Sequence, residues 1–142
     1  MTKYLYLFSI LTLIATFILL TLIGYWLFYP DNIVVVENPN QIKVDKQVYK
    51  HEEHIKYTFS YCKSRPMFGL IARALTNDIT ITYTNIYSDL EAGCHSVTFG
   101  DLFIPEFAPP GKYHINISAE YKINPIRTFI VNLQTVEFMV IE

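Results

Sequence analysis

The sequence has 142 residues, with 11 Lys or Arg, 13 Asp or Glu and a net charge of −2 at pH 7. Ten basic and all 13 acidic residues lie beyond residue 30, with both signs interspersed. This mildly acidic balance lacks the basic patch that nucleic-acid-binding proteins need, and it argues against electrostatic docking on anionic lipid.

The first predicted element is an apolar helix over residues 4–28, a stretch without Asp, Glu, Lys, Arg, His, Asn or Gln. At about 1.5 Å per residue this helix is roughly 37 Å long, enough to cross a hydrocarbon core of about 30 Å. Aromatic residues cluster at both ends of this stretch, and Tyr and Trp side chains favour the headgroup level of a bilayer. We therefore expect residues 1–30 to form a transmembrane anchor that contacts the lipid bilayer through residues 4–28.

Two alternatives to a signal-anchor remain. A cleaved signal peptide has an apolar core of roughly 7–15 residues and a small-residue cleavage site, whereas residues 24–29 are mostly bulky aromatics. A globular core helix normally has a polar stripe, which the scattered Ser9, Thr12, Thr16 and Thr21 do not form. A lipoprotein signal is excluded, because the first cysteine is Cys62.

Flanking charges predict the orientation of this anchor. Lys3 and the α-amino group precede the apolar stretch, while Asp31 and Glu37 follow it. The positive-inside rule then places the N-terminus in the cytoplasm and the C-terminal domain outside, in the periplasm or at the cell surface. Pro30 suits the end of the helix, since the residue before a proline is disfavoured in the α region. The expected topology is single-pass, type II.

The first half of the body reads as short strands. A β-branched run covers residues 33–36, and residues 38–40 form a turn. Residues 41–49 alternate, with Ile42, Val44 and Val48 on the apolar face and Lys46 interrupting it, as in an edge strand. Residues 55–62 then show period two, with a buried face expected from Ile55, Tyr57, Phe59 and Tyr61.

The second half continues this pattern. Residues 67–75 fit either a core segment or an exposed partner-binding loop, and residues 79–84 and 97–104 read as strands, the latter kinked at Gly100. Residues 112–123 alternate most strongly, with an inward face of Tyr113, Ile115, Ile117, Ala119, Tyr121 and Ile123. In the last strand, residues 127–141, the apolar face changes from Phe129, Val131 and Leu133 to Val136, Phe138 and Val140, which predicts a bulge near Gln134.

These patterns predict an all-β domain over residues 31–142, an antiparallel β-sandwich of about seven strands. Residues 109–119, PPGKYHINISA, resemble the penultimate strand of immunoglobulin-like and fibronectin-type-III-like sandwiches. The resemblance makes Tyr113 the corner tyrosine, whose hydroxyl bonds back to the backbone. The chain departs from these families in having its only Trp, Trp26, in the anchor, and no cysteine in the strand after Tyr113. The resemblance implies the sandwich architecture and no binding residues.

Two cysteines, Cys62 and Cys94, complete this description. In an oxidising compartment we expect them to form a disulfide, which would stabilise the fold by about 3 kcal/mol in the chain-entropy model. The alternative is a pair of buried free thiols. Alternation places Cys62 on the face opposite the aromatic one, which argues against a buried bridge.

Few residues suggest chemistry. His51 and His54 are the most metal-like pair, but the flanking pattern is strand and loop, and spacing supplies no third ligand, so we expect a solvated loop. A thiol–base pair of Cys94 and His95 is excluded if Cys94 is bridged. Asn116 begins an Asn-Ile-Ser glycosylation acceptor sequence on the outward face. We expect no catalytic residue, cofactor site or metal site.

The function expected from these features is that of a membrane-anchored, extracytoplasmic binding or structural module of a cell envelope, acting through protein–protein contacts and not as an enzyme. Strand edges or loops would contact the partner. The alternative is a membrane-active lysis or secretion component whose helix oligomerises under control of the sandwich domain.

Overall fold

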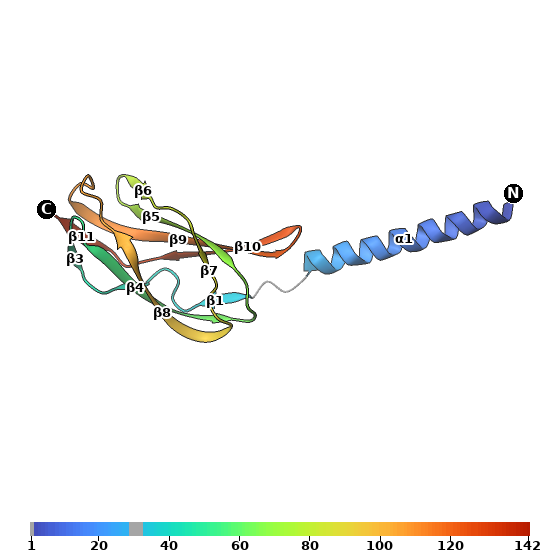
Figure 1. Ribbon diagram of the computed structural model, residues 1–142, viewed down its shortest axis with the longest axis horizontal. Helices are drawn as coiled ribbons and strands as arrows, with labels where there is room; N and C mark the ends of the chain where they lie inside the picture. The colour runs from blue at the N-terminus through green and yellow to red at the C-terminus, as the bar shows by residue number, and fades with distance from the viewer. Residues whose placement is uncertain (1, 29–32) are drawn as a thin grey trace.

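The computed structural model describes residues 2–28 and 33–142 as one long helix followed by a two-layered β domain (Figure 1). The helix is α1 (Thr2–Phe28). The strands are β1 (Val34–Val36), β2 (Lys43–Val44), β3 (Val48–Lys50), β4 (His54–Lys63), β5 (Gly69–Thr76), β6 (Thr80–Thr82), β7 (Ile86–Ser88), β8 (Gly93–Phe103), β9 (Gly111–Asn124), β10 (Arg127–Gln134) and β11 (Phe138–Ile141). The predicted helix end at Pro30, the charge of Asp31 and the boundary between residues 30 and 31 lie outside the described residues.

Helix α1 is exposed along its apolar length except at Gly24 and Trp26, which are half-buried. No residue of Lys3–Phe28 is buried, which excludes a core helix of this domain. The hydroxyls of Thr12, Thr16 and Thr21 each donate to the carbonyl four residues earlier at 2.8 Å, so they need no partner outside the helix. By length and composition α1 can cross a membrane, a property that signal sequences share.

The smaller sheet is built around β4. Strand β8 pairs along one side of β4, and the short strands β1 and β2 pair along the other. The period-two prediction for this strand is confirmed, because its aromatic face is buried and its other face is largely exposed. The buried residues are Ile55, Tyr57, Phe59 and Tyr61.

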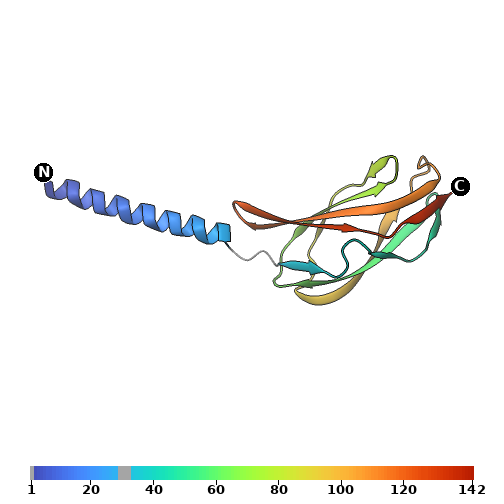
Figure 2. The same cartoon turned by 180° about the vertical axis from the view of Figure 1, so that it is seen from behind.

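The larger sheet runs in the order β3-β11-β9-β5-β6, with β10 also on β9 and β7 also on β5. Its central strand β9 shows the predicted alternation, and its inward face is buried at Tyr113, Ile115, Ile117, Ala119 and Tyr121. The apolar faces of both sheets form one core cluster, and the sheets lie face to face in two views (Figures 1 and 2). This confirms an all-β, two-sheet domain.

The larger sheet is mixed, whereas the smaller one is antiparallel throughout its described strands, which corrects the prediction of a purely antiparallel sandwich of about seven strands. The described residues form eleven strands, and β3 pairs with β11 in parallel. An isolated bridge between Ile42 and Thr135 is parallel as well. Several of the additional strands contain only two or three residues, too short to give a periodic signal in the sequence.

Residues 41–49 are not one strand, contrary to prediction. Strand β2 pairs with β4 in the smaller sheet, whereas β3 pairs with β11 in the larger one, so the chain crosses between the layers. The intervening residues change which side chains face inward: Val48 is 49% exposed, and Tyr49 is fully buried. The Tyr49 hydroxyl donates to the carboxylate of Asp45, which stabilises this crossing.

Two irregularities were predicted, at Gly100 and near Gln134. Ile55 pairs with Leu102 and Tyr57 with Phe99, so β8 carries one extra residue around Gly100, as in a β-bulge. The second irregularity falls at residues 135–137, between β10 and β11.

The face change near Gln134 differs in detail from the prediction. Thr135 is buried, its N–H donates to the Ile115 carbonyl at 3.0 Å, and its Oγ1 accepts from the Ile115 N–H at 2.8 Å. Val136 does not join the inward face, since it is 38% exposed. The face therefore changes after Thr135, because the backbone there is tied to β9.

Residues 67–75, ambiguous in the sequence, are mostly the core strand β5. Ile71 and Leu75 are buried, so the core alternative holds for this strand. Phe68, just before the strand, is 74% exposed.

Candidate functional site

The two cysteines form a disulfide between adjacent strands, as predicted. Cys62 of β4 lies directly opposite Cys94 of β8, with a Cα–Cα distance of 4.0 Å and an S–S distance of 2.04 Å. Both residues are exposed, so the alternative of buried free thiols is wrong. Because Cys94 is bridged, it cannot act as the thiol of a thiol–base pair with His95.

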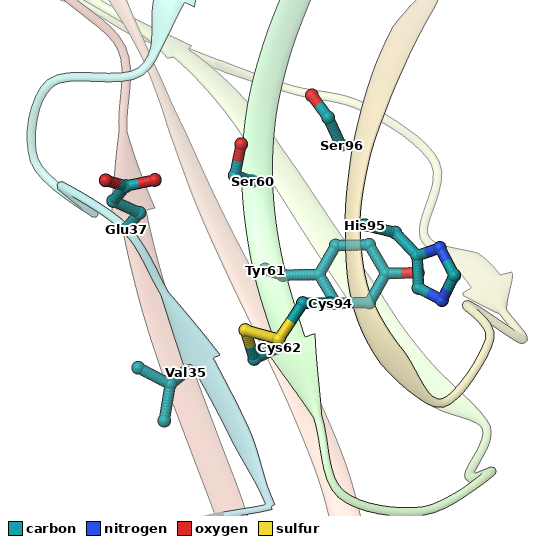
Figure 3. Close-up of a pocket in the computed structure, with 8 residues that line it drawn as sticks. All are labelled: Val35, Glu37, Ser60, Tyr61, Cys62, Cys94, His95 and Ser96. Atoms are coloured by element: carbon teal, nitrogen blue, oxygen red, sulfur yellow. A yellow bond between two sulfur atoms is a disulfide. The ribbon is translucent and has the colours of Figure 1, made fainter.

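The bridge lies in a shallow hollow of about 480 Å³, hereafter the disulfide hollow (Figure 3). Its lining is mostly apolar surface, including the disulfide, with two serine hydroxyls and one carboxylate among the polar groups. The residues are Val35, Glu37, Ser60, Tyr61, Cys62, Cys94, His95 and Ser96. They come from β4, from β8 and from the segment that begins with β1, so the hollow reaches across the smaller sheet from β1 over β4 to β8.

Two aromatic rings pack together beside the disulfide hollow. The ring centroids of Tyr61 and His95 are 5.9 Å apart, and the rings lie side by side in Figure 3. The Tyr61 hydroxyl donates to the Glu91 carbonyl at 3.3 Å, and His95 Nε2 lies 3.0 Å from the Ala92 carbonyl oxygen. These contacts hold the segment before β8 against β4.

One side of β8 is open. Among the described residues β8 pairs with β4 alone. At Cys62 and Cys94 the Cα–Cα distance of 4.0 Å is that of a non-hydrogen-bonded pair, which is near 4.5 Å rather than 5.5 Å. The Ser60 carbonyl accepts from the Glu37 N–H at 3.0 Å, on the side of β4 away from β8.

These contacts determine which backbone groups of β8 face outward. Non-hydrogen-bonded pairs recur at every second residue of an antiparallel ladder. Cys94, Ser96 and Thr98 therefore direct their N–H and C=O groups away from β4. Residues 93–99 contain no Lys, Arg, Asp, Glu or Pro, the residues with which proteins protect sheet edges. We call the outward backbone of these residues the open edge.

The other long edge is less accessible. Strand β10 pairs with β9 alone among the described strands, but residues 39–42 cover its end. The Gln134 N–H donates to the Pro39 carbonyl at 2.7 Å, and the Ile42 N–H donates to the Gln134 carbonyl at 3.0 Å. Arg127 begins the strand at the other end. Strand β8 is thus both longer and less protected.

A buried arginine, not singled out in the sequence, fixes the far end of β8. Arg73 of β5 faces the core and is 5% exposed, and its Nη1 donates to the Asp101 carboxylate just after the bulge at Gly100. Its Nη2 lies 3.5 Å from the Thr84 carbonyl oxygen. In the sequence, the only sign was that this charged residue shares the alternation of Ile71 and Leu75 and so points to the same face. That pattern could not show which residue of the other sheet pairs with it.

Two tyrosines near Arg73 have perturbed ionisation. Burial raises the pKa of Tyr57 to about 12, although the nearby Arg73 guanidinium opposes the rise. Burial likewise raises the pKa of Tyr83 to about 12, again against the effect of Arg73. The Tyr83 hydroxyl donates to the Phe103 carbonyl at 2.7 Å, which ties the end of β8 to the larger sheet. Residues 101–103 are therefore tied to the larger sheet as well as to β4.

His51 and His54, which were expected to lie in a solvated loop, contact different neighbours. His51 Nε2 lies 2.8 Å from the Ala108 carbonyl oxygen, and the His54 ring lies 6.4 Å from that of Phe103. Within residues 2–28 and 33–142, no three His, Cys, Asp or Glu side chains gather as metal ligands would. Asn116 lies on the exposed face, where its Nδ2 donates to Thr76 Oγ1 at 3.2 Å.

Tyr113 makes the hydrogen bond expected of a corner tyrosine. Its side chain is fully buried, and its hydroxyl donates to the Pro109 carbonyl, four residues earlier, at 2.8 Å. This bond fixes the corner before β9.

Comparisons with known proteins add little to this geometry. The sequence matches no protein-family model and no curated protein. Among solved structures, the chain is similar to the alkylpurine DNA glycosylase AlkC of Pseudomonas fluorescens (TM-score 0.42, 13% identity), covering 76% of this chain and 30% of the glycosylase. It is also similar to a Niemann-Pick type C2 protein of the Japanese carpenter ant (TM-score 0.42, 11% identity; 75% and 98% covered). A third similar structure is the β-glucosidase EmGH1 of Erythrobacter marinus (TM-score 0.37, 12% identity), where the match covers 72% of this chain and 15% of the glucosidase. The chain spans less than a third of the glycosylase and less than a sixth of the glucosidase, and none of these likenesses bears on function.

Proposed function

We propose that this chain is a single-pass, type II membrane protein whose extracytoplasmic β-sandwich is a binding module of a cell envelope. The observation that carries the proposal is the open edge of β8. An edge strand with unpaired N–H and C=O groups is a template for another strand, and many proteins bind extended peptides in this way. The partner is an extended segment of another protein, which adds to the smaller sheet beside β8.

The membrane-anchored part of the proposal rests on two features of the chain. Helix α1 is long, apolar on all sides and exposed, which suits a lipid environment. An exposed disulfide such as Cys62–Cys94 persists in oxidising compartments, which supports a domain outside the cytoplasm.

The open edge and the disulfide hollow supply complementary parts of a binding site. The outward backbone of Cys94, Ser96 and Thr98 can hydrogen-bond a partner strand whatever its sequence. Side chains on one face of that strand then extend over the outer face of the smaller sheet. Hydroxyl groups predominate there, including Thr58 and Thr98, whose Oγ1 atoms are 2.7 Å apart. The site therefore favours small or polar partner side chains on that face.

An immunoglobulin-like topology is part of the same proposal. The Tyr113–Pro109 hydrogen bond supports it, since that contact characterises the tyrosine corner. A chain that crosses from β2 in one sheet to β3 in the other is compatible with a sandwich of this type.

The alternative of a lysis or secretion component would rest on pairing of α1 with other helices. The Thr12 and Thr16 hydroxyls, the residues best placed for polar pairing, are already bonded within their own helix. We therefore prefer the binding module.

A substitution in the open edge tests the binding function. Proline is tolerated in an edge strand where its missing N–H would face solvent, so Ser96→Pro removes one outward donor without breaking the β4–β8 ladder. A photo-cross-linking residue at Thr98 of the full chain, in cells, should yield an adduct that Ser96→Pro abolishes. The same probe at Thr128 on β10 serves as control. An adduct that survives Ser96→Pro would show that the edge is not the binding site.

Protease accessibility tests the orientation. In a Gram-negative host, the sandwich should resist protease in intact cells and be digested in spheroplasts. Protection in both would place the domain in the cytoplasm and contradict the proposal.

A further inference from the structure

The β9–β10 hairpin contacts the end of helix α1. Asn124 Nδ2 donates to the Trp26 carbonyl at 3.0 Å, and Arg127 Nη1 donates to the Leu27 carbonyl at 2.6 Å. The hairpin extends toward the helix in both views (Figures 1 and 2). The last four carbonyls of a helix have no partner within it, and a cation is favourable at this end of the helix dipole. The hairpin therefore caps the helix through side chains that are about 100 residues away in the sequence.

The length of α1 determines the depth of this contact. The 26 residues Lys3–Phe28 span roughly 39 Å, about 9 Å more than a hydrocarbon core of about 30 Å. When the helix crosses a bilayer, the excess places its last turn, with Tyr25 and Trp26, in the headgroup layer, which these residue types favour. Asn124 and Arg127 are within hydrogen-bond distance of that turn, so the hairpin lies at the same depth.

The residues around the contact suit a phospholipid headgroup layer. Ile126, in the hairpin turn, is an apolar side chain that is 52% exposed. Arg65 approaches from the β4–β5 connection, where its Nη2 lies 3.5 Å from the Ile123 carbonyl oxygen. Arg65, Ile123, Asn124, Tyr25 and Trp26 line one shallow hollow at this junction. Guanidinium groups pair well with phosphate, and an exposed isoleucine gains by entering the acyl boundary.

We infer that the β9–β10 hairpin inserts its turn into the headgroup layer of the bilayer that α1 crosses, and that Asn124 and Arg127 hold it there. The inference rests on the proposed membrane anchor. It requires phosphate groups and an apolar boundary but no anionic lipid, so it agrees with the overall acidic charge of the domain. The sandwich is then held close to the membrane rather than swinging freely from the helix.

A depth measurement tests this inference on the full chain in phosphatidylcholine vesicles. Ile126→Cys is labelled with an environment-sensitive fluorophore, and the Cys62–Cys94 bridge leaves the new thiol as the reactive one. The control is Asp78→Cys, in the β5–β6 turn at the other end of the ladder between β5 and β9. A nitroxide on the lipid headgroup should quench the label at residue 126 several-fold more than the label at residue 78.

The same vesicles test the anchor separately. Trp26 is the only tryptophan, so its emission reports the end of α1 without any substitution. Quenching of Trp26 by brominated lipid with no excess quenching at residue 126 would overturn the hairpin insertion and leave the anchor intact. Absence of quenching at both positions would overturn the anchor and the inference together.

A double substitution tests the role of the two capping side chains. With Asn124→Ala and Arg127→Ala added to the labelled Ile126→Cys chain, quenching should fall toward the level at residue 78. Unchanged quenching would overturn the assignment of these two residues as what holds the hairpin. Near-ultraviolet circular dichroism establishes that each variant keeps the sandwich folded.

Discussion

Helix α1 and the β-sandwich are both rich in apolar residues, but they use them in opposite ways. In α1, Leu13 and Phe17 are 68% and 72% exposed, whereas in the sandwich Leu75 and Ile115 are fully buried. The helix is apolar around its whole circumference, so no side of it can face water while another packs on a core. Each long strand alternates, so one face builds a core and the other is solvated. Periodicity, more than apolar content, thus separates a segment that needs lipid from one that folds on itself.

The largest expected effect comes from the same substitution made in both regions. Leu75→Ala opens a cavity in a fully buried site and should lower the free energy of unfolding by about 2–5 kcal/mol. Leu13→Ala should leave that free energy unchanged, because its side chain packs on no part of the sandwich. Denaturant titration of the full chain in detergent measures both. Equal losses of stability would mean that α1 contributes to the folded core, and would contradict this difference between the helix and the sandwich.

The second largest effect is expected from the Cys62–Cys94 disulfide, which lies in the sandwich and not in α1. Replacing both cysteines, Cys62→Ala with Cys94→Ala, should cost about 3 kcal/mol of sandwich stability, because the unfolded chain regains the entropy of an open loop. The helical signal in the far-ultraviolet circular dichroism spectrum, which comes from α1, should not change. Treatment of the original chain with a reducing agent should give the same loss. A cost below about 1 kcal/mol would show that the β4–β8 ladder alone supplies the stability.

Alkaline pH should destabilise the sandwich through its buried phenols. The pKa of Tyr57 and that of Tyr83 are each raised to about 12 in the folded state, above the ordinary value of 10. Folding therefore favours the protonated phenols, and this contribution is present below pH 10 and lost as pH rises from 10 to about 12. The loss should be on the order of 2 kcal/mol for the buried Tyr57 and smaller for Tyr83, which is only half-buried and therefore screened by solvent. Tyr57→Phe should weaken the pH dependence, and an undiminished slope would exclude Tyr57 as a source.

The smallest expected effect concerns single hydroxyl groups. Tyr113→Phe removes the hydrogen bond to the Pro109 carbonyl and should cost about 1 kcal/mol. Tyr87→Phe is the matched control, because Tyr87 is 80% exposed. If both substitutions have the same effect on the denaturation midpoint, the corner hydrogen bond does not stabilise the domain.

Local pattern predicted much of the architecture. Strands β4 and β9 were recognised because one face is continuously buried, and a slip of one residue would expose the whole face. The outward position of Cys62 followed from the same parity. The hydrogen bond of Tyr113 was expected from the resemblance of residues 109–119 to immunoglobulin-like and fibronectin-type-III-like sandwiches.

The features that were missed depend on contacts between distant segments. The open edge of β8 is defined by which strands do not pair with it, and the pairing of Arg73 with Asp101 joins different sheets. The capping of α1 by Asn124 and Arg127 likewise has no local signal.

The sequence by itself determined an apolar helix, an alternating β domain and the outward position of the Cys62 side chain. These properties depend on neighbours within about ten residues, where side-chain period and backbone geometry are coupled. Tertiary structure alone decided the crossing from β2 to β3, the parallel pairing of β3 with β11, the exposed edge and the junction with the helix. The reason is that strand partners and buried charges are selected by packing between the layers, which no single segment encodes.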